Sequence, residues 1–390
     1  MAQNLIQQDI LAGKRLLSLD VFRGVTIAAM IMVNNPGSWN HMYAPLQHAD
    51  WHGLTVTDLI FPFFLFIVGV SIVLAFSKQQ ARGVTDSEIV KKIATRTIII
   101  FGLGLLMHGF PYVTFQDGFG IHDYVSNLRI MGVLQRIALC YMAASFMYLY
   151  LKPKTIIWVM GGILVIYWLL MMFVPVPGYG AGMIDERETN LAAWLDRLIF
   201  TRNHLWDGMV YDPEGLFSTF PAIVTTLVGV FTGKILFSNR QIYEKISLFF
   251  LWGFFLFTLG YVWGWFFPIN KALWTSSFAL LVSGLAMMVF AATYWLIDVK
   301  GYQRFTHLFV VYGVNPLIVF FMSGILSRTL SITELTVDGE VITLRNYIFE
   351  NVFLPIASPI NASLLYSIVW VLAWFVVLAY MYKKKIFIKV

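Results

Sequence analysis

The sequence is poor in charge, in cysteine and in periodic glycine, and each shortage excludes a class of protein. Only 12% of its 390 residues are Asp, Glu, Lys or Arg, about half the ~25% typical of soluble domains. The single cysteine excludes a disulfide scaffold, and the lack of a glycine repeat excludes collagen. Hydrophobic residues make up 59% of the chain, too many for a disordered protein. The composition therefore predicts an all-α polytopic membrane protein, with lipid as its main solvent.

Apolar runs without charged residues mark the expected transmembrane helices. A helix needs roughly 20 such residues to cross the hydrocarbon layer, and the short fourth run reaches this length if it begins near Arg129. Proline and glycine mark several ends of these runs. We therefore expect about ten transmembrane helices, within residues 24–49, 59–77, 97–116, 137–151, 155–184, 215–233, 246–270, 272–297, 305–327 and 351–382.

Basic residues are distributed unevenly between the two sides of these helices. With the N-terminus in the cytoplasm, the inner loops hold 19 of the 27 Lys and Arg residues but only 6 of the 21 Asp and Glu residues. The inner side then carries a charge of +13, although the net charge of the chain is only +6. The positive-inside rule therefore predicts that both termini are cytoplasmic. Because the basic residues lie in short loops between apolar runs, we expect no nucleic-acid partner.

The first apolar run is expected to stay in the membrane instead of being removed as a signal peptide. Asp20 and Arg23 interrupt what would be the apolar core of a signal, and no small-residue cleavage site follows. These two residues are three apart and share a helix face. They either neutralise each other or leave Arg23 free to bind an anion from the cytoplasm. Charges at membrane depth are functional candidates in general.

Three long outer segments contain Trp, His, Asp and Pro instead of Gly/Ser repeats, and we expect them to be ordered. Long ordered loops usually carry function. No internal repeat or low-complexity stretch is visible, so we expect residues 1–390 to form a single integral membrane domain. The outer segments are residues 36–57, 178–214 and 328–360.

The first outer segment and its flanks carry the most chemistry. His48 and His52 are four residues apart, but the Glu of a helix-borne zinc site is missing between them, so we expect no metal. A neutral imidazole can instead act as a general base, or as a nucleophile toward an acyl donor. The nearby Asn34, Asp50 or Asp58 could fix the tautomer of such a histidine.

A series of short motifs runs along nearly the whole chain in a fixed order. They are Ser18–Gly24, Val33–Asn34, His48–Thr55, Asp58–Pro62, Arg129–Ile137, Tyr211–Gly215, Pro268–Trp274 and Gly313–Pro316. As an ordered set they resemble the heparan-α-glucosaminide N-acetyltransferase family, and especially its bacterial NagX-type members.

This resemblance implies acetyl transfer across a membrane. The co-substrate would be acetyl-CoA from the cytoplasm, and the acceptor the amine of glucosamine or of a short amino sugar on the periplasmic side. The family's catalytic histidine matches His48, and its functional asparagine matches Asn34. Asp50 and His52 depart from the animal enzyme, which favours a short acceptor over a polymer. The resemblance also implies the bacterial inner membrane as the location and a homodimer as the assembly.

Further polar residues complete the predicted site, and Asp58 joins His48 and Asn34 in its catalytic part. Outer-loop residues predicted to bind the acceptor are Asp50, Trp51, His52, Asp212, Glu214, Asn270 and Lys271. Residues predicted to bind acetyl-CoA are Arg23, Arg129, Arg136 and Asn315. The expected partner of Arg136 is Asp58, Gln135 or a CoA phosphate, and a purely structural ion pair is an equal alternative.

Two chemistries and two other functions stay open at the level of sequence. His48 acts as the base in a ternary complex, or it becomes transiently acetylated and passes the group on. An O-acyltransferase of a surface glycan would share the acetyl-CoA side and differ in the acceptor. A secondary transporter of an amino sugar would use the same helices and buried charges, but it would not require an outer-side histidine.

Overall fold

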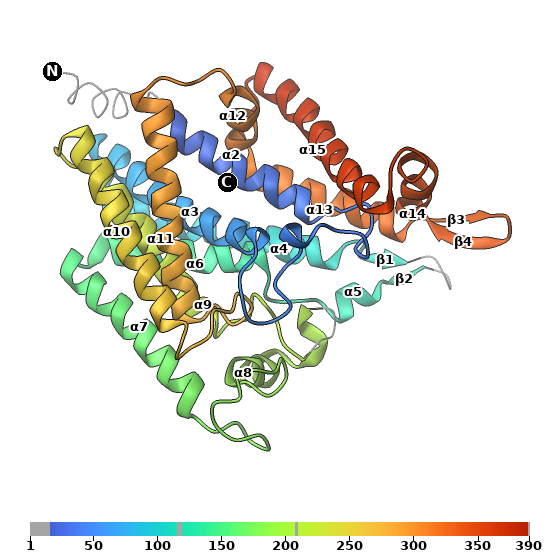
Figure 1. The fold of residues 1–390 in the computed structure, drawn as a ribbon, viewed down its shortest axis with the longest axis horizontal. Helices are drawn as coiled ribbons and strands as arrows, with labels where there is room; N and C mark the ends of the chain where they lie inside the picture. The colour runs from blue at the N-terminus through green and yellow to red at the C-terminus, as the bar shows by residue number, and fades with distance from the viewer. Residues whose placement is uncertain (1–15, 115–118, 207–209, 389–390) are drawn as a thin grey trace.

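The computed structural model describes residues 16–114, 119–206 and 210–388, which are mainly helical (Figure 1). The long helices are α2 (Leu17–Val33), α3 (Val56–Ala81), α4 (Asp86–Gly109), α6 (Val133–Tyr150), α7 (Pro153–Phe173), α9 (Thr219–Leu236), α10 (Ile242–Trp263), α11 (Ser276–Tyr294), α13 (Pro316–Ile332) and α15 (Pro359–Lys383). The shorter elements are η1 (Ala44–Leu46), α5 (Asp123–Ser126), α8 (Leu191–Phe200), η2 (Arg202–His204), η4 (Trp295–Val299), α12 (Thr306–Val314), α14 (Leu344–Ile348) and η5 (Phe349–Phe353). Two antiparallel hairpins pair β1 (Val113–Thr114) with β2 (Gly120–Ile121) and β3 (Glu334–Val337) with β4 (Glu340–Thr343).

Eight helices in the described part of the chain are long and apolar enough to cross a membrane. A ninth span results if α12 and α13, bent by 82° at a short break, count as one. These spans correspond to nine of the ten predicted runs. The remaining run, 97–116, coincides with α4, whose first half carries five charged residues. The chain is thus a helical membrane protein, while the count of ten and the cytoplasmic termini stay predictions.

The first helix, α2 (Leu17–Val33), begins before the charge-free run 24–49. Asp20 and Arg23 lie inside the helix with their side chains 3.5 Å apart, so the pair does not delay the start of the helix. The helix ends just before Pro36, which lacks the N–H that a further helical turn needs. This end agrees with the prediction that an outer segment begins at residue 36, and residues 34–55 form the loop that carries His48.

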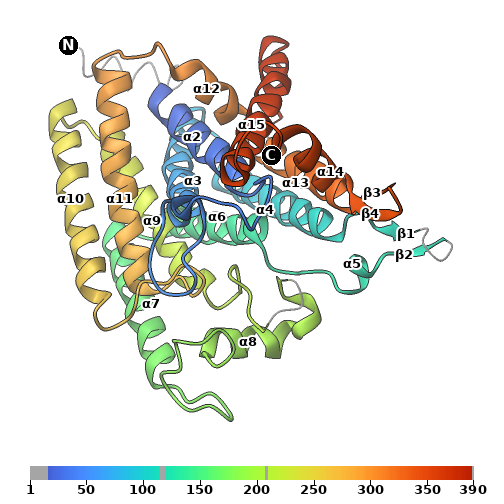
Figure 2. The ribbon, with the colours of Figure 1, turned by 45° about the vertical axis from the view of Figure 1, so that its right-hand side comes forward.

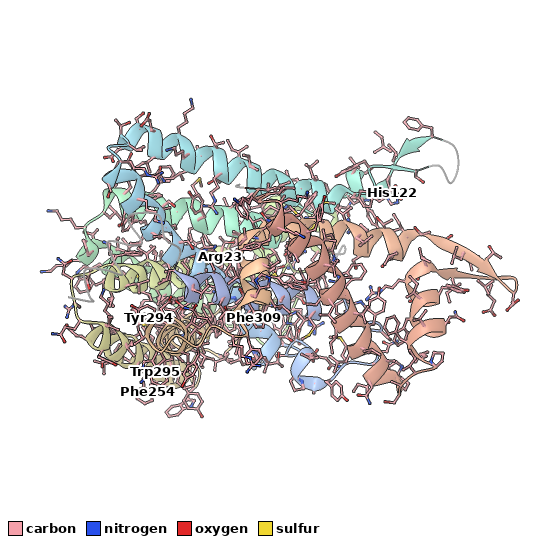
Figure 3. All side chains as sticks on the ribbon, turned by 90° about the horizontal axis from the view of Figure 1, so that it is seen from above. Arg23, His122, Phe254, Tyr294, Trp295 and Phe309 are labelled. Atoms are coloured by element: carbon pink, nitrogen blue, oxygen red, sulfur yellow. The ribbon has the colours of Figure 1, made fainter. Side chains whose placement is uncertain are left out.

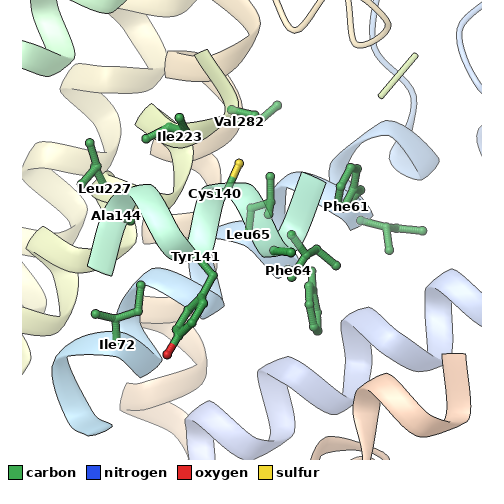
Figure 4. Packing of buried hydrophobic residues seen from close by; sticks show 14 of the residues in the cluster. Phe61, Phe64, Leu65, Ile72, Cys140, Tyr141, Ala144, Ile223, Leu227 and Val282 are labelled. Atoms are coloured by element: carbon green, nitrogen blue, oxygen red, sulfur yellow. The ribbon is translucent and has the colours of Figure 1, made fainter. Parts of the chain in front are cut away.

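Two helices form the centre of the bundle and others lie at its periphery. The most apolar window of α3 is 72% buried and that of α9 is 78% buried, against 22% for α7 and for α10. Figure 4 shows side chains of α6 meeting those of α3 and α9, with Cys140 among them. The prediction that Cys140 is a small core residue is confirmed, since its side chain is fully buried. The apolar peripheral helices suit contact with lipid.

Small residues let α3 and α9 approach closely. A Cβ at Gly69 would collide with the carbonyl oxygen of Thr226, and one at Gly229 would collide with that of Phe66. Close backbone approach through small residues is a common way of packing helices in membranes, because burial of apolar surface provides little driving force for helix association in lipid. This contact holds α3 in place, and α3 carries Asp58 at its first turn.

The predicted outer segments are ordered but only partly loops. The segment 178–214 contains α8, which lies near the lower end of α7 (Figure 1). The segment 328–360 begins inside α13 and continues into the hairpin β3–β4, which lies beside α14 (Figure 2). Arg328, the first residue of this predicted segment, lies inside α13. Its guanidinium donates hydrogen bonds to the last carbonyls of α4, those of Met107, His108 and Phe110, at 3.2, 2.8 and 3.0 Å.

Candidate active site

His48 is paired with the carboxylate of Asp58. The imidazole Nδ1 lies 2.6 Å from Asp58 Oδ1, and Asp58 is only 1% exposed while the His48 side chain is 49% exposed. A hydrogen bond of this kind holds the proton on Nδ1 and leaves Nε2 as the basic nitrogen. The predicted link between His48 and a neighbouring carboxylate therefore has a geometry suited to general base catalysis.

Asp58 is held in place by the start of α3. Its Oδ2 accepts hydrogen bonds from the backbone N–H groups of Ala49 and Thr55, both at 3.0 Å, and from Thr55 Oγ1 at 3.0 Å. Thr55 and Asp58 form a capping box at this helix terminus. A carboxylate is also favoured there by the helix dipole. The local sequence Thr55 to Asp58 thus fixes the carboxylate that orients His48.

Lys271, from the loop between α10 and α11, completes a cluster of three side chains. Its Nζ lies 3.2 Å from His48 Nδ1, 3.3 Å from His48 Nε2 and 3.9 Å from Asp58 Oδ1. Burial lowers the pKa of Lys271 below its usual value, although the carboxylates of Glu214 and Asp58 oppose this shift. The cluster therefore joins a base, a carboxylate and a cation from two distant parts of the chain.

The cluster opens into a cavity of about 710 Å³, which we call the His48 cavity. Its walls combine charged groups of both signs with the rings of five aromatic side chains. Seven predicted site residues contribute to this lining: Asn34, His48, Asp50, Trp51, Asp58, Glu214 and Lys271. The aromatic rings belong to Trp39, Trp51, Phe61, Trp206 and Tyr211. The cavity is thus large enough for a small polar molecule, and it offers such a molecule both carboxylates and cations.

One side of the His48 cavity is closed by the segment before α8. Arg187 donates to the Asp50 carbonyl oxygen at 2.8 Å and to Asp50 Oδ1 at 2.7 Å, and it lies over the rings of Trp51 and Tyr211 at 5.9 and 6.0 Å. Trp51 Nε1 in turn donates to the Ile184 carbonyl at 2.9 Å. Arg187 was missed at the level of sequence, and only its place in the long outer segment 178–214 pointed to it.

His52 and Asn270 support the cavity without lining it. His52 Nε2 lies 3.0 Å from Asp185 Oδ1, and His52 Nδ1 lies 3.3 Å from Asn270 Nδ2. The buried Asn270 accepts from the backbone N–H of Leu273 at 2.8 Å. These contacts shape the turn that carries Lys271, while the direct acceptor contact predicted for both residues stays a prediction.

Arg129 joins the two acidic residues that precede α9. It donates to Asp212 at 2.8 and 2.6 Å and to Glu214 at 2.7 Å. Burial on its own would raise the pKa of Glu214, but the charges of Arg129, Lys271 and Arg136 hold that pKa below its usual value. Arg129 therefore lies at the same end of the molecule as His48 and is bonded to carboxylates, an arrangement that does not favour the predicted contact with acetyl-CoA.

Arg136 is fully buried inside the bundle and has none of the predicted partners in the hydrogen bonds of the described chain. It donates to the Gly215 carbonyl at 3.0 Å and to Ser218 Oγ, and it lies 5.1 Å from the centre of the Trp274 ring. The predicted contact with Asp58 is wrong, because Asp58 is committed to His48. Arg136 instead ties α6 to the turn that carries Glu214.

A second cavity of about 370 Å³ lies further along α3 and α6, and we call it the Arg23 cavity. Arg23, which projects from the middle of the bundle in Figure 3, donates to Ser71 Oγ at 2.8 Å and to the Gly313 carbonyl at 3.3 Å. Arg96 also lines this cavity, and its buried Nε has no hydrogen-bond partner in the described part of the chain. Of the four residues predicted to bind acetyl-CoA, Arg23 alone lines the Arg23 cavity.

Asn315 lies at the break between α12 and α13 and holds the C-terminal residues. Its Nδ2 donates to the Ile386 carbonyl at 3.0 Å, and its Oδ1 accepts from the Ile388 N–H at 2.9 Å. Ile388 in turn contributes to the lining of the Arg23 cavity. Asn315 therefore shapes the edge of this cavity through the chain terminus, and its own amide is already engaged.

The two cavities follow each other along the same pair of helices. On α3, Phe61 lines the His48 cavity and Phe64 lines the Arg23 cavity. On α6, Val133 lines the His48 cavity and Ile137 lines the Arg23 cavity. Three to four residues correspond to roughly 5–6 Å along a helix. About one helical turn of apolar side chains thus separates the two cavities. Among the described residues no group of three or more His, Cys, Asp or Glu side chains is arranged to hold a metal ion.

Comparison with known proteins identifies relatives over most of the chain. The profile of the family described as heparan-alpha-glucosaminide N-acetyltransferase, catalytic, matches residues 15–261. A Mus musculus protein named heparan-alpha-glucosaminide N-acetyltransferase is 28% identical over 428 aligned residues, which cover 97% of this chain and 61% of that protein. The Homo sapiens protein of the same name is 29% identical over 360 residues, which cover 78% of this chain and 52% of that protein.

The chain spans about half to three fifths of the length of these curated relatives. The matched region includes Asn34, His48 and Asp58. Since the profile covers more than half of the sequence, the chain belongs to the heparan-alpha-glucosaminide N-acetyltransferase family.

Proposed function

We propose that the protein is a membrane N-acetyltransferase that moves the acetyl group of acetyl-CoA to the amine of glucosamine or of a short amino sugar. The observation that carries this proposal is the His48–Asp58 pair in a cavity that lies one helical turn from a second, arginine-lined cavity. Membership of the family supports the same reaction class.

The reaction needs a base, because an attacking amine must lose a proton. His48 Nε2 accepts this proton while Asp58 holds the Nδ1 proton and stabilises the imidazolium that forms. The new N–C bond forms at the thioester carbonyl, the C–S bond breaks, and CoA leaves as a thiol after taking the proton from His48. The Lys271 ammonium, 3.3 Å from Nε2, is close enough to stabilise the oxyanion of the tetrahedral intermediate.

The charge of each cavity suits a different substrate. The His48 cavity contains Asp50, Asp58 and Glu214 beside Arg187 and Lys271, which offer hydrogen bonds to the neutral amine and the hydroxyl groups of a sugar, while its indole and phenol rings offer faces to the sugar ring. The Arg23 cavity offers the guanidinium groups of Arg23 and Arg96 to an anionic acyl-CoA. Only the thin apolar layer around Phe61 and Phe64 must open for the thioester to reach His48.

The direct test uses purified protein in detergent with acetyl-CoA and glucosamine. We expect release of the CoA thiol that depends on the sugar, with N-acetylglucosamine identified by mass. His48→Ala should lower the rate by about 10²–10⁴-fold, whereas the control His41→Ala, on the same loop but outside the lining of the His48 cavity, should retain the rate. An active His48→Ala protein would refute the catalytic assignment.

The same assay separates the two chemistries. Acetyl-CoA without acceptor should leave His48 unmodified in intact-mass measurements if the histidine acts as a base. An adduct of one acetyl group that disappears when glucosamine is added would mean that His48 forms an acetyl-imidazole intermediate instead of acting as a general base.

A further inference from the structure

A third cavity, of about 400 Å³, adjoins the His48 cavity and, unlike that cavity, has no carboxylate among its described lining residues. It lies between the end of α2, the end of α4, α13 and α14, and we call it the two-arginine cavity. None of the described residues that line it is acidic, whereas Arg328 and Arg345 both contribute to its wall. No proposed step of the acetyl transfer uses this cavity.

Within the described residues, both arginines are hydrogen-bonded to neutral groups only. Arg328 donates to three backbone carbonyls at the end of α4 and lies 4.6 Å from the centre of the Tyr124 ring. Arg345 donates to the Pro36 carbonyl and lies 6.0 Å from the centre of the Trp39 ring. Backbone carbonyls and rings orient a guanidinium but do not neutralise it.

The two positive charges lack a carboxylate within ion-pair distance in the described part of the chain, in contrast to Arg129, which contacts Asp212 and Glu214. Burial lowers the pKa of Arg345, against a smaller opposing effect of the Tyr366 phenol. A guanidinium has five N–H donors, so each arginine keeps donors for a further partner. The cavity is therefore suited to an oxyanion, which two guanidinium groups bind with charge-assisted hydrogen bonds.

This cavity lies next to the His48 cavity. Asn34 and Trp39 line both cavities, so the two cavities meet at these two side chains, and the proposed acceptor would extend past them. At one end the ligand would meet the acidic groups around His48, and at the other end it would meet two arginines. This arrangement selects for a molecule with an amine at one end and an anion at the other.

We propose that the two-arginine cavity is an oxyanion subsite of the acceptor site, in which Arg328 and Arg345 bind a phosphate or sulfate group carried by the amino sugar. This inference rests on the proposed function and narrows the class of acceptor from short amino sugars in general to those that carry an anionic group. It also assigns the orientation of the acceptor, with its amine toward His48 and its anion toward α13 and α14.

The test compares glucosamine, glucosamine 6-phosphate and glucosamine 6-sulfate as acceptors at saturating acetyl-CoA. We expect kcat/KM for at least one anionic sugar to exceed that for glucosamine by about 10–100-fold, the range that a charge-assisted hydrogen bond supplies. The two anionic sugars together show whether phosphate or sulfate is preferred.

Two variants locate the effect. Arg345→Gln should lower kcat/KM for the preferred anionic sugar about 10-fold more than for glucosamine. Ser327→Asp places a carboxylate in the same lining while keeping both arginines, and it should abolish the preference. The matched control Arg202→Gln removes an arginine that pairs with Glu188 at 2.6 Å and lies outside the lining of all three cavities, so it should leave the preference unchanged.

The outcomes separate this inference from the proposed function. If the wild-type protein acetylates glucosamine and both anionic sugars equally well, the subsite is refuted and the acetyltransferase stands. If no sugar is acetylated, thermal stabilisation decides. If glucosamine 6-phosphate or 6-sulfate stabilises the wild-type protein but not Arg345→Gln, the subsite is supported although the reaction is not. If neither sugar stabilises the wild-type protein, both the subsite and the proposed function are refuted.

Discussion

At the scale of single residues, the contact that matters most is that between His48 and Asp58. Asp58 accepts four hydrogen bonds, one of them from His48. An amide in its place can still accept from the backbone, but it cannot stabilise an imidazolium by charge, and it can turn its NH₂ group toward the ring and reverse the tautomer.

Asp58→Asn should therefore lower kcat by about 10²–10⁴-fold with a smaller change in KM. Steady-state rates of the acetyl transfer assay measure this effect. Asp338→Asn, in the exposed β3–β4 turn, is the control and should retain full activity. A variant at position 58 with near-normal kcat would mean that His48 needs no carboxylate partner.

Asp196 on α8 gives the protein a stability that depends on pH. The side chain is 2% exposed, and burial, reinforced by the charge of Asp212, raises its pKa from 3.8 to about 7. An acid with a raised pKa binds its proton more tightly in the folded state, so its contribution to stability is complete below pH 4 and is lost as the pH rises to 7.

We therefore expect the apparent Tm in detergent to fall between pH 4 and pH 7, with a change in unfolding free energy of at most about 4 kcal/mol. In Asp196→Asn this part of the pH dependence should vanish, because the amide does not titrate. A series of melting curves at fixed ionic strength tests the expectation. Parallel profiles of wild type and variant would exclude Asp196 as the source.

At the scale of elements, the contact between α3 and α9 positions the catalytic carboxylate. Gly229 of α9 faces the Phe66 carbonyl of α3 so closely that a Cβ would collide with the backbone. Backbone atoms cannot move aside as a flexible side chain can. The separation of the two helices must therefore increase if this glycine is replaced.

Gly229→Ala should destabilise the protein by about 1–3 kcal/mol, the usual range for an overpacked core, and reduce activity because Asp58 moves with α3. Gly161→Ala on α7 is the matched control, since nothing lies within 4 Å of a Cβ at that position. It should be neutral or slightly stabilising. Equal melting temperatures for the two variants would show that α3 and α9 tolerate a wider spacing.

At the scale of the whole molecule, the proposed reaction depends on sidedness. The distribution of Lys and Arg predicts that the loop with His48 is outside and the loop 300–305 is inside. Single cysteines introduced into a Cys140→Ser background report on which side of the membrane each loop lies, because Cys140 is the chain's one cysteine.

In intact bacterial cells, His41→Cys should react with a membrane-impermeant maleimide, and Tyr302→Cys should react only after the cells are permeabilised. Both positions are accessible in the folded protein, since the side chains of His41 and Tyr302 are exposed. The opposite labelling pattern would mean that the protein has the reverse orientation in the membrane and that its acetyl acceptor is cytoplasmic.

Much of the site could be predicted from the sequence because its residues are unusual for their surroundings. His48, Asp50 and Asp58 follow one another in a polar segment between two apolar runs, and the structure brings them to one cavity with Glu214 and Lys271. Segments at the same end of a helix bundle meet in space, so polar residues from several such segments are good candidates for one site.

The roles of the arginines could not be predicted in the same way. Arg129 and Arg136 stood out because charges near membrane depth are rare, but the sequence does not show which carboxylate or carbonyl each would meet. Arg129 contacts Asp212 and Glu214, and Arg136 contacts Gly215 and Ser218. These partners lie about 80 residues away in the chain, and only packing decides such pairs.

By itself, the sequence determined that this protein is a helical membrane protein with a histidine-rich polar segment between its first two spans. Apolar length and charge spacing suffice for this, because lipid imposes the same demand on every helix. Only the tertiary structure decided that His48 pairs with Asp58, that Lys271 joins them, and that the His48 cavity and the two-arginine cavity lie side by side. Those features depend on distances between side chains far apart in sequence, which arise from the way the helices pack.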